Sequence, residues 1–143
     1  MNREITITIV LYEENYLSVS KCLENLKLFK IIIIDNAGDH ELKKKILNKF
    51  NIYKYIINKT NVGFSKGANQ AIKLCDTEYV LNIESDCLIN EKDILNLLES
   101  LKKYKNCMVV TPTFYNEDST ISYNEGPLPE KELEISPLLL EGD

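Results

Sequence analysis

The chain has 143 residues, of which 44% are hydrophobic and 27% are charged, and its formal net charge is -5. This is the composition of one globular domain that is long enough to bury a sizeable core. The acidic balance excludes a general nucleic-acid-binding surface, so a phosphate-rich ligand would need a metal ion or backbone donors. The apolar runs are too short to span a bilayer, and the N-terminus lacks the layout of a signal peptide.

Predicted strands and helices alternate along the chain. The predicted strands are rich in β-branched and aliphatic residues and cover residues 5–11, 31–34, 52–57, 79–83 and 107–111. The predicted helices repeat apolar residues at helical spacing and cover residues 16–28, 41–50, about 69–74, and 91–104. This alternation implies parallel strands joined by right-handed crossovers, and hence a doubly wound α/β sheet.

Two further features of the folded part concern the second helix and the cysteines. Asp39 is a candidate N-cap, and Lys43, Lys44 and Lys45 are expected to face solvent, which leaves contact with an anionic membrane surface open. The four cysteines show no metal-ligand spacing, which favours reduced and buried thiols over disulfides. They are Cys22, Cys75, Cys87 and Cys107. Together with the N-terminus, the thiols predict a cytoplasmic location, with the inner face of the membrane left open.

The character of the chain changes at Pro112. All four prolines lie from there onward, and residues 116–143 carry eight acids against the single base Lys131. We therefore divide the chain into a domain of residues 1–115 and an acidic, proline-containing tail of residues 116–143. The tail could instead be the start of a second half of a longer protein. Its apolar segment, residues 135–140, suggests that more chain follows or that a partner covers it, and self-association stays open.

Acidic residues end two of the predicted strands. Glu84 and Asp86 close the fourth strand, and Asp35 closes the second. Buried strands rarely carry paired acids, and open α/β sheets bind ligands beyond the carboxyl ends of their strands. Two carboxylates there can bind a divalent cation, which in turn can hold a diphosphate. The alternative is that they form a solvated turn in which Asp86 caps the next segment, and that Asp35 stabilises an Asx turn.

The loop of residues 61–67 carries two further candidates. Gly63 could let the backbone approach a phosphate or could only shape the edge of the pocket. Lys66 is the one base in a position to meet a diphosphate, although a solvated lysine is the commoner case.

Four motifs, in order, resemble those of family 2 glycosyltransferases. They are Leu11-Tyr12-Glu13, the Ile-Ile-Asp-Asn-Ala of residues 33–37, the Asn-Val-Gly-Phe loop of residues 61–69, and the strand of residues 79–86 that ends in an Asp-x-Asp-like pair. The chain resembles the N-terminal, nucleotide-binding half of that family, which has the GT-A fold, a Rossmann-like three-layer sandwich around a mostly parallel sheet. The likeness covers about the first 115 residues.

The resemblance implies roles for these positions. Asp35 would bind the base, Tyr12 would lie beside it, and Gly63 and Lys66 would lie near the nucleotide. Glu84 would approach the ribose, and Asp86 with Glu84 would hold Mg²⁺ or Mn²⁺ on the diphosphate. The implied reaction is transfer of a sugar from a nucleotide-diphosphate donor to a hydroxyl of a saccharide, a lipid-linked acceptor or a protein, with inversion, as in polysaccharide biosynthesis.

The sequence departs from the family at three of these positions. Leu11 stands where Thr is common, Glu13 where Asn is common, and Glu84 where the first Asp is expected. No residue aligns to the family's catalytic base. A non-catalytic nucleotide-sugar-binding module therefore remains an alternative, and a nucleotidyltransferase is a weaker one because the first strand lacks a glycine-rich, basic loop.

Overall fold

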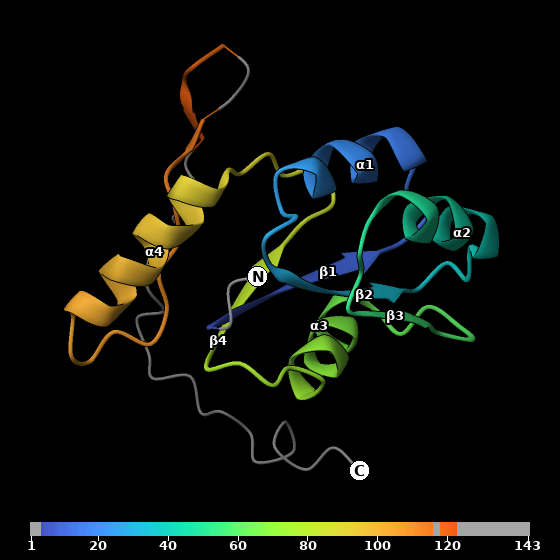
Figure 1. The fold of residues 1–143 in the computed structure, drawn as a ribbon, viewed down its shortest axis with the longest axis horizontal. Helices are drawn as coiled ribbons and strands as arrows, with labels where there is room; N and C mark the ends of the chain where they lie inside the picture. Colours follow the sequence, from blue (N-terminus) through green and yellow to red (C-terminus); the bar gives the residue numbers. More distant parts are fainter. Residues whose placement is uncertain (1–3, 116–117, 123–143) are drawn as a thin grey trace, which may run out of the picture.

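Strands and helices alternate as predicted in the computed structural model, which describes residues 4–115 and 118–122 (Figure 1). The strands are β1 Ile5–Leu11, β2 Lys30–Asp35, β3 Lys54–Ile57, β4 Tyr79–Ile83, β5 Phe114–Tyr115 and β6 Ile121–Ser122. The helices are α1 Tyr16–Glu24, α2 His40–Lys49, α3 Phe64–Lys73 and α4 Glu91–Lys103. In the described residues no helix is long and apolar enough to cross a membrane.

The main sheet has the strand order β3-β2-β1-β4, and every neighbouring pair is parallel. The order reverses at β1, which pairs with β2 on one side and β4 on the other. The α/β architecture with a parallel sheet is therefore confirmed. Residues 31–34 of β2 are 0–2% exposed, which explains why a continuous isoleucine run suits this strand.

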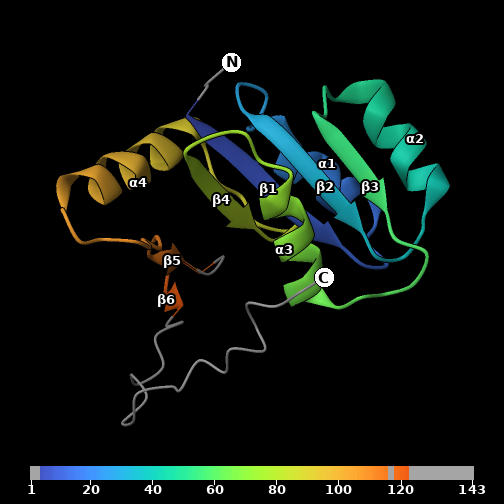
Figure 2. The same cartoon turned by 90° about the horizontal axis from the view of Figure 1, so that it is seen from below.

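Helices cover both faces of the sheet, which makes three layers. Side chains of α1, α2 and α4 share one core with the odd-numbered residues of β1, such as Ile7 and Ile9. α3 covers the opposite face, where Ala71 packs against Ile32 and Ile34. Figure 2 shows α3 in front of the sheet and α1 behind it. The candidate N-cap Asp39 is confirmed, because its Oδ1 accepts from the N–H of Leu42 at 2.8 Å.

Glycine at position 67 allows α3 to lie close to β1. A Cβ atom there would lie 3.0 Å from Val10 Cγ1, so we expect Gly67→Leu to lower the free energy of unfolding by about 1–3 kcal/mol. Ser65→Leu is the matched control, since Ser65 is exposed on the same helix. The difference between the free energies of unfolding of the two variants in urea measures the steric clash with Val10. Equal stabilities of the two variants would contradict this account of the contact.

All four cysteines are free, as predicted, but only Cys22 is buried. Burial raises the pKa of Cys22 to about 12, with smaller contributions from Cys87 and Asp86. Its thiol lies against the backbone at the end of β4, with Sγ 3.8 Å from the carbonyl oxygen of Glu84.

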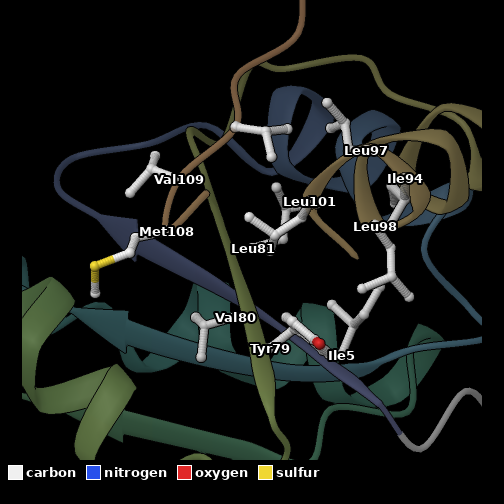
Figure 3. A pocket seen from close by; sticks show the side chains of 11 residues that line it. Ile5, Tyr79, Val80, Leu81, Ile94, Leu97, Leu98, Leu101, Met108 and Val109 are labelled. Atoms are coloured by element: carbon white, nitrogen blue, oxygen red, sulfur yellow. The ribbon is translucent and has the colours of Figure 1, made fainter. Parts of the chain in front are cut away.

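The predicted strand at residues 107–111 is wrong. This segment runs beyond α4 without strand pairing, and Met108 and Val109 are 90% and 82% exposed. Figure 3 shows these side chains beside an apolar pocket between β4 and α4. Apolar β-branched residues favour a strand only where a partner accepts their backbone hydrogen bonds, and in the described residues none does so here.

Other boundaries also differ from prediction. α3 begins at Phe64, inside the predicted loop of residues 61–67, and β3 begins at Lys54 instead of residue 52. α1 ends at Glu24 instead of residue 28. Asn25 is its C-cap, and the chain then turns through Leu26 into β2. A short antiparallel pair, β5 with β6, extends into the segment that we assigned to the tail. The apolar segment 135–140 lies outside the described residues.

Candidate active site

A pocket of about 330 Å³ lies at the carboxyl ends of the parallel strands. It is bounded by the end of β1, the residues after β2 and β4, and the start of α3. The lining residues are Val10, Tyr12, Glu14, Asn36, Asn61, Gly63, Phe64, Glu84, Ser85 and Asp86. It lies where the strand order reverses at β1, which is where open α/β sheets bind ligands. Its size falls within the range of small-molecule sites.

The acid pair Glu84 and Asp86 lines this pocket directly after β4. Both residues are exposed, whereas Ser85 between them is 4% exposed. The Cys87 N–H donates to the Glu84 carbonyl oxygen at 3.1 Å, so the chain turns immediately after the strand. Glu14 adds a third carboxylate to the lining, and none of the lining residues is a lysine or arginine. An anionic ligand would therefore meet repulsion here unless a cation accompanied it.

The chemistry of these side chains fits a divalent cation that takes part of its coordination from a ligand. Carboxylate oxygens suit Mg²⁺ and Mn²⁺, and Mg²⁺ commonly binds through one or two carboxylates with phosphate and water. In the described part of the chain, no three His, Cys, Asp or Glu side chains lie together as a metal-binding group. Glu84 and Asp86 would thus form an open site that phosphate oxygens complete, not a closed cage.

Tyr12 lines the pocket directly after β1 and is 49% exposed. The next residue, Glu13, has φ 55°, in the left-handed region that few residues other than glycine and asparagine adopt readily. This turn carries the chain from Tyr12 to the pocket residue Glu14. It also gives a physical reason for the asparagine that the resembled family commonly has where this chain has Glu13.

Gly63 contributes to the pocket through the backbone at the start of α3. It is the N-cap residue, has φ 82°, and provides no side-chain cap. Asn61 Oδ1 accepts from the Gly63 N–H at 2.8 Å, which fixes the preceding turn. The partial positive charge of a helix N-terminus therefore lies at the edge of a pocket whose side-chain charges are negative.

Asp35 is brought to the same end of the sheet, but it does not line the pocket. Its side chain is 0% exposed and makes its hydrogen bonds within the protein. The N–H groups of Ala37 and Gly38 donate to Oδ1 at 2.8 and 3.0 Å, and the Tyr55 hydroxyl donates to Oδ2 at 3.0 Å. This carboxylate holds the turn after β2.

The contribution of Tyr55 to the free energy of unfolding depends on the pH. Burial, followed by the charge of Asp35, raises the pKa of Tyr55. A raised pKa in the folded protein means that the neutral phenol is favoured by folding. This stabilisation is complete below the unfolded pKa of about 10 and is lost as the pH rises above it. We expect the free energy of unfolding of wild type to fall by up to about 1.4 kcal/mol per pH unit more steeply than that of Tyr55→Phe.

The measurement is urea unfolding between about pH 9 and pH 11. Tyr104, which is 60% exposed, provides the matched control Tyr104→Phe, which should keep the steep wild-type slope. If the free energy of unfolding had the same pH dependence in wild type and Tyr55→Phe, the raised pKa of the buried, hydrogen-bonded Tyr55 would be contradicted.

The remaining candidate, Lys66, is exposed on α3 and is not a lining residue. Sequence reasoning did not identify six of the lining residues, which are Val10, Glu14, Asn36, Asn61, Phe64 and Ser85. The position of Asn36 and Ser85 beside the acids at two strand ends could have indicated them. Glu14 had no signal of its own, because its place depends on the left-handed turn at Glu13.

The comparisons with known proteins agree with this architecture. Of the solved structures, S. aureus TarS 1-349 matches with 23% identity and a TM-score of 0.55, over 80% of this chain and 40% of that one. A second structure, S. aureus TarS, matches with 26% identity and the same TM-score, over 80% of this chain and 24% of that one. The chain thus spans less than half the length of the solved structures it matches.

No curated protein matches the sequence. The sequence model described as Glycosyl transferase family 2, however, matches residues 6–138, nearly the whole chain. With the parallel three-layer fold, this confirms the GT-A expectation. The chain belongs to glycosyl transferase family 2.

Proposed function

We propose that this chain binds a nucleoside-diphosphate sugar in the pocket after β1, β2 and β4 and transfers the sugar to a hydroxyl acceptor. The observation that carries the proposal is the convergence of Glu84, Asp86, Tyr12 and Gly63 on one pocket at the carboxyl edge of a parallel sheet. Four segments separated along the sequence supply this lining, and the family match supports the reaction class.

Each side of the pocket would have its own part in donor binding. Tyr12 offers an aromatic face for the base, and the start of α3 at Gly63 places a helix N-terminus toward the diphosphate. Glu84 and Asp86 would hold Mg²⁺ or Mn²⁺, which when bound supplies Lewis-acid stabilisation of the departing diphosphate. Holding the donor in one orientation presents its anomeric carbon to the acceptor, as single displacement with inversion requires.

The part of Asp35 in this proposal is indirect. Its carboxylate fixes the turn of Ala37 and Gly38 and the hydroxyl of Tyr55, and so holds the chain on both sides of the pocket residue Asn36. This differs from the direct contact with the base that the resemblance implies. Saccharide, lipid-linked and protein hydroxyls are the acceptor classes that we propose.

The direct test is a thermal-shift panel of UDP-, GDP-, TDP- and CDP-sugars, each with and without Mn²⁺. We expect at least one donor to raise the melting temperature, and to do so more strongly with the metal. Ligand at 100 times its Kd stabilises a folded protein by about 2.7 kcal/mol, a readily measured shift. A panel without any shift would overturn the proposal.

A nucleotide-sugar-binding module without transfer activity is the second candidate. It is favoured because the proposal gives the lining residues parts in donor binding and assigns none of them to activating an acceptor. Slow hydrolysis of the bound nucleotide sugar, measured by release of the nucleoside diphosphate, would favour the enzyme. Binding without any turnover would favour the module.

A further inference from the structure

Asn36 ties the end of β2 to the start of α3 through its side-chain amide. It follows the buried Asp35 at the end of β2, lines the pocket and is only 4% exposed. Its Nδ2 donates to the Gly63 carbonyl oxygen at 3.2 Å, and its Oδ1 accepts from Asn58 Nδ2 at 2.8 Å. Its backbone N–H donates to the Leu11 carbonyl oxygen at 2.8 Å. The residue is thus held by β1, by the end of β3 and by the start of α3.

The partners fix which way this amide faces. The Gly63 carbonyl can only accept, so Asn36 must present its NH₂ group to it. That carbonyl also accepts from the Gly67 N–H at 3.1 Å, the first backbone bond of α3. Asn58 Nδ2 donates in turn to Gln70 Oε1 at 2.9 Å, which ties the far side of the amide to the middle of α3.

We propose that Asn36 is a positioning residue for nucleotide binding. Its amide holds the Gly63 carbonyl, and with it the segment of Asn61, Gly63 and Phe64, at a fixed place in the pocket that the acid pair also lines. The proposal rests on the proposed function, since a nucleoside diphosphate bound at the acid pair is the ligand that this segment would meet. The start of α3 has no side-chain cap, so loss of the Asn36 amide would leave this end of the helix held to β2 less tightly.

Asn36→Asp tests hydrogen-bond direction with almost no change in size. The ionised carboxylate can still accept from Asn58, but it opposes the Gly63 carbonyl as a second acceptor. Burial raises the pKa of such a carboxyl, and its protonated form regains a donor for Gly63. Asn36→Ala also lacks the donor but carries no titratable group, so the weakening in that variant should not depend on pH. Asn48→Asp is the matched control, because Asn48 is exposed on α2.

The experiment measures Kd by calorimetry for UDP, GDP, TDP and CDP with Mn²⁺, at about pH 7.5 and about pH 5. The Kd of each variant is divided by the wild-type Kd at the same pH, so that the effects of pH on the nucleotide and on the metal cancel. We expect Asn36→Asp and Asn36→Ala to bind about tenfold more weakly at the higher pH. At the lower pH Asn36→Asp should recover to within about threefold, whereas Asn36→Ala should not, and Asn48→Asp should match wild type throughout.

Hydrogen exchange across residues 61–67 supplies a readout that needs no ligand. It should be faster in Asn36→Asp than in Asn48→Asp at the higher pH and equal at the lower pH. Wild-type affinity and wild-type exchange in Asn36→Asp would overturn the inference while leaving the proposed function intact. If wild type binds none of the four diphosphates, the proposed function fails and the nucleotide role of Asn36 fails with it.

Discussion

Replacing Asp86 with asparagine is expected to abolish the metal-dependent binding of a nucleotide sugar. Asp86 lines the pocket beside Glu84. Glu14 also lines it, but no three His, Cys, Asp or Glu side chains of the described residues lie together as a metal-binding group. Asparagine keeps the size of the side chain but removes the negative charge that attracts a hard cation. We expect the Mn²⁺-dependent rise in melting temperature to vanish and nucleotide-sugar turnover to fall by about 100-fold or more.

The matched control is Asp93→Asn. Asp93 is an exposed acid in the first turn of α4 and is not a lining residue of the pocket. This control should keep the full Mn²⁺-dependent rise in melting temperature. A loss of that rise in Asp86→Asn is then caused by the change at the site and not by the change in net charge. A wild-type response from Asp86→Asn would remove the acid pair from the mechanism. A response that survives without metal would instead point to binding through the backbone at the start of α3.

Replacing Asp35 with alanine is expected to be the most destabilising change near the site. The 0%-exposed carboxylate accepts from Ala37, Gly38 and Tyr55, and alanine would leave these donors without their partner. Unsatisfied buried donors cost about 1–3 kcal/mol each, and neighbouring groups recover part of that loss by relaxing. We expect the free energy of unfolding to fall by about 3–4 kcal/mol in urea titrations.

Asp35→Asn separates the supporting role from direct contact with the base. Its oxygen can still accept from Ala37 and Gly38, and its NH₂ group can donate to the Tyr55 hydroxyl oxygen. We therefore expect a loss of about 1 kcal/mol in stability and nucleotide affinity within about threefold of wild type. Near-wild-type stability with affinity reduced more than about tenfold would contradict the supporting role and favour the contact that the family resemblance implies.

The sequence predicted the elements whose pattern is local. Continuous isoleucines in β2 and the alternation in β1 indicated buried strands, and the structure pairs the two in parallel. Asp39 was recognised as a cap because its role depends only on the next three residues. Residues 107–111 have the same apolar, β-branched character as β2, yet they form no strand. Strand formation requires a partner edge, which composition does not encode.

The sequence alone placed Glu84 and Asp86 at a strand end. An apolar run that stops at two carboxylates can be recognised without any tertiary information. Only the folded chain decided which side chains face the pocket. Asp35 and Asn36 are neighbours at the end of β2. Asp35 is buried and accepts hydrogen bonds from Tyr55 and from the following turn, whereas Asn36 lines the pocket. Successive side chains point to opposite sides, and their surroundings come from β3 and α3, more than fifteen residues further along the chain.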